Sequence, residues 1–141
     1  MVIRPDDVPL GATTIPFIDA KQPPQVLVVD DAEAIRRCLG LFLRSNGYRV
    51  LEAADGRAAQ MILRVEHPEL VISDLDMPIG DGWELLSYCH AQHPTVPVLI
   101  TSGAALGKHP EIERWAAGYL PKPFSFERIR AELHRLVGRA A

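Results

Sequence analysis

The fold of this chain is decided by the stretch QVLVVDD at residues 25–31. Its four apolar residues, Val26 to Val29, are valines and one leucine, and they lie between Pro24 and an acidic pair. A short apolar run bounded in this way is typical of a strand that is buried on both faces. Such strands occur in parallel sheets that carry helices on both sides.

The pattern of strand and helix repeats outward from this stretch. Further short apolar runs predict strands at 48–53, 70–72, 98–100 and 119–120. Helical spacing of apolar residues, with capping residues before it, predicts helices at 32–46, 55–66, 80–90, 112–116 and 125–136. Five strands alternating with five helices predict an α/β protein with an open, doubly wound parallel sheet. We expect one domain over residues 25–138, a flexible leader at 1–24 and a tail at 139–141.

The composition excludes several classes of protein. The 141 residues are 48% hydrophobic and 23% charged, as in an ordinary globular domain, and the formal charge of −3 leaves no basic surface for direct nucleic-acid binding. The two cysteines, Cys38 and Cys89, are too few and too far apart for a disulfide framework or a CxxC site, so we expect both to be buried on helices. No apolar run approaches the roughly 18 residues that cross a bilayer. We therefore expect a cytoplasmic protein without a membrane partner.

Chemically active side chains follow four of the predicted strands. Asp30 and Asp31 follow the first, Asp74 the third, Thr101 the fourth and Lys122 the fifth. Because ligands of such sheets bind beyond the carboxyl ends of the strands, we expect these side chains to gather at one edge. Carboxylates this close repel one another, and a hard cation such as Mg²⁺ would offset that repulsion.

Mg²⁺, a lysine, a hydroxyl and a lone carboxylate are together what phosphoryl transfer needs. The cations would neutralise the phosphoryl oxygens while a carboxylate attacks in line. Asp74 is the best candidate for the nucleophile, since Asp30 and Asp31 are adjacent and suit metal binding. Taken singly, each residue has an ordinary interpretation, as a helix cap or a turn residue. The hypothesis depends on their joint arrangement.

At this point the sequence resembles a known family, the receiver domain of bacterial two-component response regulators. The resemblance covers about residues 25–138 and is carried by these motifs: VVDD at 28–31, ISDLDMP at 72–78 followed by Asp81-Gly82, LIT at 99–101 and YLPKPF at 119–124. It implies a flavodoxin-like sheet with strand order 2-1-3-4-5. Because no effector domain follows within the 141 residues, we expect a single-domain, chemotaxis-regulator-like receiver.

The resemblance also implies roles for the acidic residues. Asp74 would be the phosphorylated residue, and the chain would catalyse its own phosphorylation and dephosphorylation without acting as an enzyme on other substrates. Asp30, Asp31 and Asp74 would be the Mg²⁺ ligands. The backbone carbonyl of Asp76 would be a further ligand.

Further roles and partners follow from the same resemblance. Lys122 would pair with the phosphoryl group, and Thr101 and Tyr119 would form the switch that reports phosphorylation. The Lys122-Pro123 bond is expected to be cis, as is typical of the family. The phosphodonor would be a histidine kinase or a histidine phosphotransfer protein. The downstream target is a protein that the sequence does not identify, and the last helix could support a homodimer.

Three alternatives stay open from the residues alone. Asp74 and Asp76 resemble the DxDx(T/V) motif of haloacid-dehalogenase-type phosphatases, although Pro78 stands at its last position. A pseudo-receiver, an interaction module without phosphorylation, is the second alternative. The third, a nucleotide-binding loop at 103–109, is a near miss and nothing more, because it lacks one residue between its glycines and has His109 where Ser or Thr is needed. The segment 102–117 is unusual for a receiver, so its conformation is not predicted beyond the short helix at 112–116.

Overall fold

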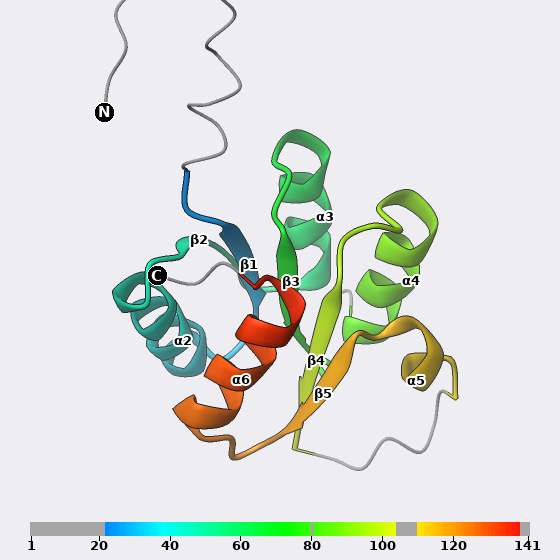
Figure 1. Cartoon of the computed structure of the whole chain (residues 1–141). Coiled ribbons are helices and arrows are strands. Elements are labelled where there is room, and N and C mark those ends of the chain that lie inside the picture. Colours follow the sequence, from blue (N-terminus) through cyan, green and yellow to red (C-terminus); the bar gives the residue numbers. More distant parts are fainter. Residues whose placement is uncertain (1–21, 80, 104–109, 139–141) are drawn as a thin grey trace, which may run out of the picture.

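The computed structural model describes residues 22–79, 81–103 and 110–138. Figure 1 labels ten elements in chain order, and the first helix in that numbering is α2. They are β1 (Gln25–Val29), α2 (Glu33–Ser45), β2 (Arg49–Ala53), α3 (Gly56–Val65), β3 (Leu70–Asp74), α4 (Gly82–Gln92), β4 (Val98–Ser102), α5 (Glu111–Trp115), β5 (Gly118–Pro121) and α6 (Phe126–Leu136). The predicted alternation of five strands with five helices is confirmed over the described residues.

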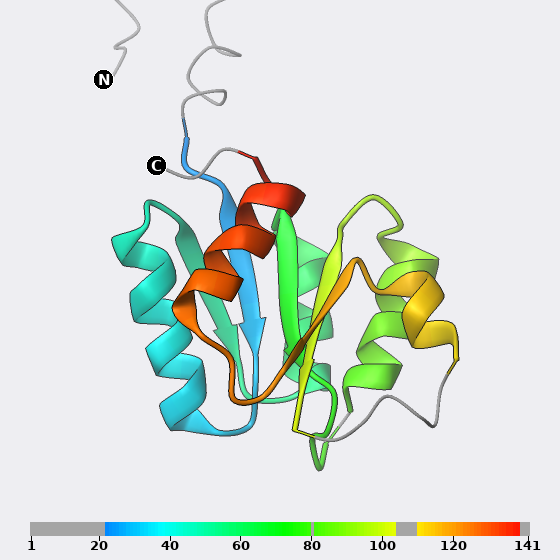
Figure 2. The ribbon, with the colours of Figure 1, turned by 60° about the horizontal axis from the view of Figure 1, so that its bottom comes forward.

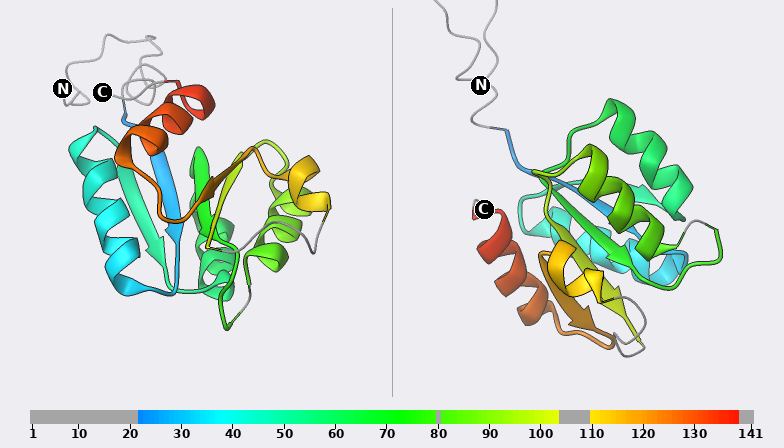
Figure 3. Two further views of the ribbon diagram at one scale, coloured as in Figure 1. Left: turned by 90° about the horizontal axis from the view of Figure 1, so that it is seen from below. Right: turned by 90° about the vertical axis from the view of Figure 1, so that its right-hand side faces the viewer.

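The strands form one sheet in the order β2-β1-β3-β4-β5, and every pair of neighbours is parallel. Helices α2 and α6 cover one face of the sheet, and α3, α4 and α5 cover the other (Figures 1 and 3). This is the doubly wound, flavodoxin-like fold with the predicted strand order. All five carboxyl ends therefore meet at one edge, which is the lower edge in Figure 2.

Burial on both faces explains the continuous apolar runs of the strands. In β1, Val26 and Val28 pack into the core beneath α2 and α6, while Leu27 and Val29 pack into the opposite core beneath α3 and α4. Successive side chains of a strand point to opposite faces, so a strand between two helical layers needs an apolar residue at each position. β1 is consequently buried along its whole length up to Val29, and the acidic pair follows directly.

Capping side chains define where three helices begin. The side chains of Asp55, Asp81 and Ser125 each accept a hydrogen bond from a backbone N–H three residues on, at the start of α3, α4 and α6. These bonds satisfy donors that the first turn of a helix leaves free. The predicted stop of α2 at Asn46-Gly47 is also confirmed, with Gly47 at a φ of 89°.

Helix α5 is attached to α4 by a stack of aromatic rings that the sequence did not indicate. The Trp115 ring lies 5.4 Å from the ring of Trp83 and 4.1 Å from that of His90, nearly parallel to both. Trp83 and His90 are two helical turns apart on α4, which leaves room for one ring between them. The stack compensates for the small contact surface of a helix of only five residues.

Some expectations need correction or fall outside the described residues. Cys89 is buried and its burial raises the pKa of the thiol to about 11, but Cys38 is exposed, so the prediction for Cys38 is wrong. The buried stripe of α2 consists of Leu39, Gly40, Phe42 and Leu43, and Cys38 lies outside it. Residues 1–21 of the expected leader, the expected tail and most of the loop at 103–109 lie outside the described residues. In the part of the chain that is described, no helix is both long and apolar enough to span a membrane.

Candidate functional site

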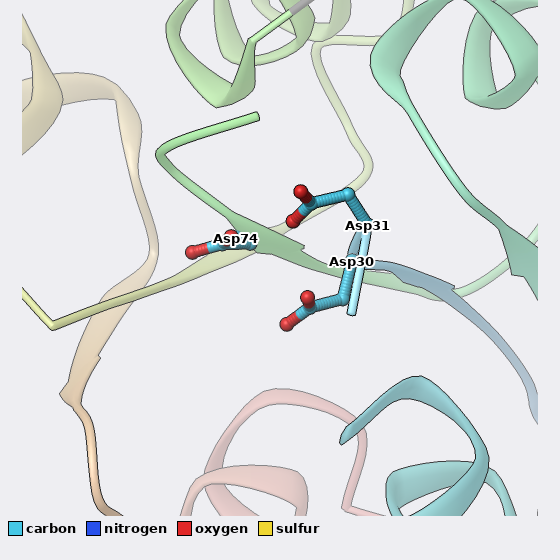
Figure 4. Close-up of side chains that lie close together, drawn as sticks. All are labelled: Asp30, Asp31 and Asp74. Atoms are coloured by element: carbon cyan, nitrogen blue, oxygen red, sulfur yellow. The ribbon is translucent and has the colours of Figure 1, made fainter. Parts of the chain in front are cut away.

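The residues predicted to be functional gather at the carboxyl edge of the sheet. Asp30 and Asp31 follow the end of β1, and Asp74 is the last residue of β3. Figure 4 shows that the carboxylates of Asp30 and Asp31 extend toward the side on which Asp74 lies. Thr101 is the register partner of Asp74 in β4, and Lys122 follows β5 directly. Four strand ends thus contribute to one site.

The carboxylates of Asp30, Asp31 and Asp74 each place an oxygen within 4.8 Å of the others. Lys122 joins them, because its Nζ lies 3.0 Å from Oδ2 of Asp30 and 3.4 Å from Oδ1 of Asp74. Asp30 and Asp74 are buried, at 1% and 6% exposure, whereas Asp31 is exposed. The predicted grouping of these four side chains is therefore present in the structure.

Asp30 is held by its neighbours at several atoms. Its backbone N–H donates to the carbonyl of Ala53 at 3.2 Å, and its Oδ1 accepts from the N–H of Ala32 at 2.9 Å. Its backbone carbonyl accepts from Nη1 of Arg36 at 2.8 Å, and its Oδ2 accepts from Lys122. This carboxylate is consequently oriented before any ligand arrives.

The electrostatics of the site are dominated by burial and by the single lysine. Burial raises the pKa of Asp74, the charge of Lys122 lowers it, and the charge of Asp30 raises it, with a net upward shift. Burial lowers the pKa of Lys122, but its hydrogen bonds and charge interactions with Asp30 and Asp74 outweigh burial and leave the pKa raised. Lys122 is therefore a permanent cation at neutral pH, facing carboxylates whose charge it offsets only in part.

This donor set fits a magnesium ion. The cluster holds three carboxylates and one ammonium, which contacts Asp30 and Asp74, so negative charge remains uncompensated there. The three clustered side chains all offer carboxylate oxygens, which hard cations such as Mg²⁺ prefer and softer metals do not. Asp31 is exposed and can present its oxygens to an ion that keeps several waters.

The remaining predicted residues lie around this cluster. The Asp76 side chain is exposed and its Oδ2 accepts from Oγ of Ser102 at 3.2 Å, so its carboxylate is not one of the three that cluster. The role expected for its backbone carbonyl stays a prediction. Thr101 is buried beside Asp74, and Tyr119 is partly buried against the core beneath α3, α4 and α5. The Lys122-Pro123 bond is cis, as expected.

Two residues that support the site were missed by the sequence analysis. Gly82 begins α4 directly against Asp74, since a Cβ there would lie 2.2 Å from the Asp74 carbonyl oxygen. Arg36 holds the backbone of Asp30 from α2. The Asp81-Gly82 pair belongs to the motif that follows Asp74, and this placement is the signal from which the close packing of Gly82 could be suspected. Nothing in the pattern of α2 distinguishes Arg36 from the other arginines of that helix.

Removing the charge of Asp74 is expected to stabilise the protein in the absence of divalent cations. In Asp74→Asn the cost of burying a charged carboxylate disappears, and the repulsion from Asp30 disappears with it. Together these outweigh the lost attraction to Lys122, so the free energy of unfolding at pH 7 should rise by about 1 kcal/mol, a size common for stabilising substitutions. Because the folded-state pKa of Asp74 is raised, the wild type loses stability as the pH rises from about 4. The stability difference between variant and wild type should therefore grow from about pH 4 upward and vanish below it.

Urea unfolding in EDTA across this pH range measures that difference. Groups that titrate in both proteins cancel in the comparison. A difference that stays constant with pH would contradict the assignment of the effect to the Asp74 charge.

The comparisons with known proteins agree with this geometry. The response regulator receiver domain family matches residues 26–134. The response regulator MprA of Mycolicibacterium vanbaalenii is 34% identical over 119 residues, which are 83% of this chain and 52% of that protein. This chain thus spans about half the length of the curated relatives it matches, such as MprA.

Two solved structures match this chain over nearly the whole of their own length. The chemotaxis response regulator CheY4 of Vibrio cholerae is 31% identical, with a TM-score of 0.71 over 81% of this chain and 98% of its own. The response regulator TrrA of Thermotoga maritima, in complex with Mg²⁺ and BeF, is 25% identical, with a TM-score of 0.75 over 80% and 98%. Taken with the site at the carboxyl edge of the sheet, these matches lead to one conclusion: the chain belongs to the response regulator receiver domains of two-component signalling.

Proposed function

We propose that this domain accepts a phosphoryl group on Asp74 in a Mg²⁺-dependent reaction, with a histidine kinase or a histidine phosphotransfer protein as donor. One observation carries the proposal: the Asp74 carboxylate lies 3.4 Å from Lys122 Nζ, within a cluster that also contains Asp30 and Asp31. Burial of Asp74 keeps water away from the nucleophile, while Lys122 is positioned to neutralise charge on the incoming group.

Each side chain of the site has a separate role in the proposed transfer. A carboxylate oxygen of Asp74 forms the new bond to phosphorus as the bond from phosphorus to the donor histidine nitrogen breaks. That nitrogen keeps the electron pair, and the donor histidine, protonated at its other ring nitrogen, leaves as neutral imidazole. Lys122 offsets charge on the phosphoryl oxygens, and its contact with Asp30 holds the ammonium in place. Asp30, Asp31 and Asp74 would hold Mg²⁺, which when bound supplies further positive charge to those oxygens.

The signalling step is proposed to involve Thr101 and Tyr119. Thr101 is the register partner of Asp74 across the β3–β4 pair, and in this proposal its hydroxyl is drawn toward a phosphoryl group on that residue. Tyr119 lies on β5, the next strand, paired with Ile100 in β4. A shift of Thr101 can therefore be transmitted to Tyr119 through neighbouring strands.

The test is intact mass spectrometry after incubation with Mg²⁺ and acetyl phosphate. The wild type is expected to gain the mass of a single phosphoryl group. Asp74→Asn, which keeps the shape of the side chain but lacks the nucleophile, should gain none. The wild type in EDTA should also gain none, because only Lys122 would then offset the negative charge of the three carboxylates and the incoming phosphoryl group.

Other results would support the alternative functions. No adduct on the wild type, with Mg²⁺ bound and no release of phosphate, would favour a pseudo-receiver. Catalytic hydrolysis of many small phosphoesters, lost in both Asp74→Asn and Asp76→Asn, would favour a phosphatase of the haloacid-dehalogenase type. The contact of Asp76 with Ser102 opposes that second outcome, because it holds the carboxylate of the would-be general acid.

A further inference from the structure

We infer that Arg36 is a positioning residue for the metal site, which it supports by holding the loop that carries Asp30 and Asp31. The inference rests on the proposed function in so far as Mg²⁺ is the ion that these carboxylates bind. Arg36 touches none of the reacting groups. It acts through the backbone of Asp30, and Glu52 on β2 braces it from the other side.

The contacts of Arg36 connect three elements. Its Nη1 donates to the backbone carbonyl of Asp30 at 2.8 Å, and its Nε lies 3.3 Å from Oε1 of Glu52. The side chain is only 15% exposed, so these contacts compete little with water. The planar guanidinium fixes the angle between its donors, and a carbonyl bound to one donor is therefore oriented by the carboxylate bound to another.

The bond to the Asp30 carbonyl determines more than the position of Asp30. The carbonyl belongs to the peptide plane that leads into Asp31, and this plane is rigid. Asp31 is exposed, and the peptide before it sets the direction in which its side chain leaves the backbone. Arg36 thus orients the peptide between the two expected ligands.

Gly40 and Arg44 of α2 fix the position of the Glu52 carboxylate. A Cβ at Gly40 of α2 would lie 3.2 Å from Oε2 of Glu52 and 3.1 Å from Nη1 of Arg44, so the glycine leaves room for this ion pair against the helix. Arg44 holds the same Oε2 at 3.4 Å. Glycine inside a helix costs about 1 kcal/mol relative to alanine, and here it lets the carboxylate that braces Arg36 pack closely.

Charge and positioning predict opposite effects of removing Arg36, which makes the inference testable. If Arg36 were only a cation near the acidic cluster, its loss would strengthen the binding of Mg²⁺ by removing repulsion. If Arg36 positions the loop, its loss weakens binding, because the carboxylates must then be ordered by the ion. Partners that orient metal ligands from outside typically contribute about 10-fold or more to metal affinity.

The experiment measures Mg²⁺ binding by titration calorimetry for Arg36→Met and the wild type. We expect the dissociation constant of the variant to be roughly 10-fold higher. Arg37→Met is the matched control, because it removes the same charge from the neighbouring position, where the side chain is 70% exposed and pairs with Glu33. The control should bind Mg²⁺ as the wild type does or slightly more tightly.

Arg36→Lys separates geometry from charge and is the second variant should Arg36→Met fold poorly. Lysine keeps the charge but cannot make both contacts at the fixed angle, so its Mg²⁺ affinity should stay low, close to that of Arg36→Met. Circular dichroism in EDTA verifies that each variant is folded. Unchanged or tighter binding in Arg36→Met, full rescue by lysine, or a wild type that binds no Mg²⁺ would overturn the inference. Phosphoryl acceptance is measured separately, so a wild type that binds Mg²⁺ but forms no adduct contradicts only the proposed function.

Discussion

Lys122→Met is expected to slow phosphoryl acceptance from acetyl phosphate by at least about 100-fold, the loss typical of removing one preorganised charge donor. Lys122 is the cation that contacts both buried carboxylates, Asp30 at 3.0 Å and Asp74 at 3.4 Å. Without it, negative charge on the phosphoryl oxygens would meet Asp30 and Asp74 with only the metal to offset it. Time-resolved intact mass spectrometry, with Mg²⁺ at saturation for each protein, measures the rate.

The same substitution is expected to destabilise the metal-free protein by about 2 kcal/mol at pH 7. Breaking a buried ion pair costs about 3–5 kcal/mol, and the figure is reduced here because Lys122 is 21% exposed. Urea unfolding in EDTA measures the change. The control is the double variant Lys122→Met/Asp74→Asn, which also removes one of the two carboxylates that have lost their contact with Lys122.

The double variant should be more stable than the sum of the two single effects predicts, because Asp74→Asn then removes a buried charge that has lost its cation partner. A double variant whose stability equals that sum would show that Lys122 and Asp74 do not interact energetically. A phosphorylation rate within about threefold of the wild type would contradict the role of Lys122 as charge donor.

Gly82→Ala is expected to destabilise the protein by about 3 kcal/mol, at the upper end for a forced overlap in a packed region. The added Cβ would lie 2.2 Å from the carbonyl oxygen of Asp74 and 2.6 Å from Cα of Leu75. Both neighbours are backbone, so no side chain can move aside. Either α4 or the end of β3 must shift, and the hydrogen bond from Gly82 N–H to the Leu75 carbonyl at 2.9 Å would be distorted.

The change at Gly82 should also slow phosphoryl acceptance, because the shifted backbone carries Asp74. Gly103→Ala is the matched control, since a Cβ there meets no atom of the described residues within 4 Å. Its unfolding free energy should be unchanged or raised by about 0.5 kcal/mol, because alanine restricts the unfolded chain. Equal stability of the two variants would contradict the packing role of Gly82.

Much of the fold could be predicted from the sequence because its signals are local. Short apolar runs predicted the strands, and the capping residues Asp55 and Ser125 predicted helix starts, which the structure confirms through their side-chain bonds. The candidate site could be predicted for a related reason. In a parallel sheet all carboxyl ends share one edge, so the residue types that follow the strands identify what will meet there.

The supporting contacts could not be predicted in this way. Cys38 and Arg36 lie on the same amphipathic helix, yet the exposure of one and the bonds of the other depend on how α2 rotates against the sheet. The Trp83, Trp115 and His90 stack depends equally on the docking of α5. A periodic pattern indicates which face of a helix is buried. It does not specify the rotation of the helix about its axis closely enough to tell which residues at the border of that face are exposed.

The sequence by itself determined the order of strands and helices along the chain. It also determined the burial of the central strands and the set of side chains at the carboxyl edge. Only the tertiary structure decided that Lys122 lies against Asp30, 92 residues earlier in the chain, that Glu52 braces Arg36, and that Gly82 packs on the backbone of Asp74. The physical reason is the separation along the chain of the residues that interact. Periodicity and capping arise between residues a few positions apart, whereas these contacts form at distances of a few ångströms between elements that packing alone brings together.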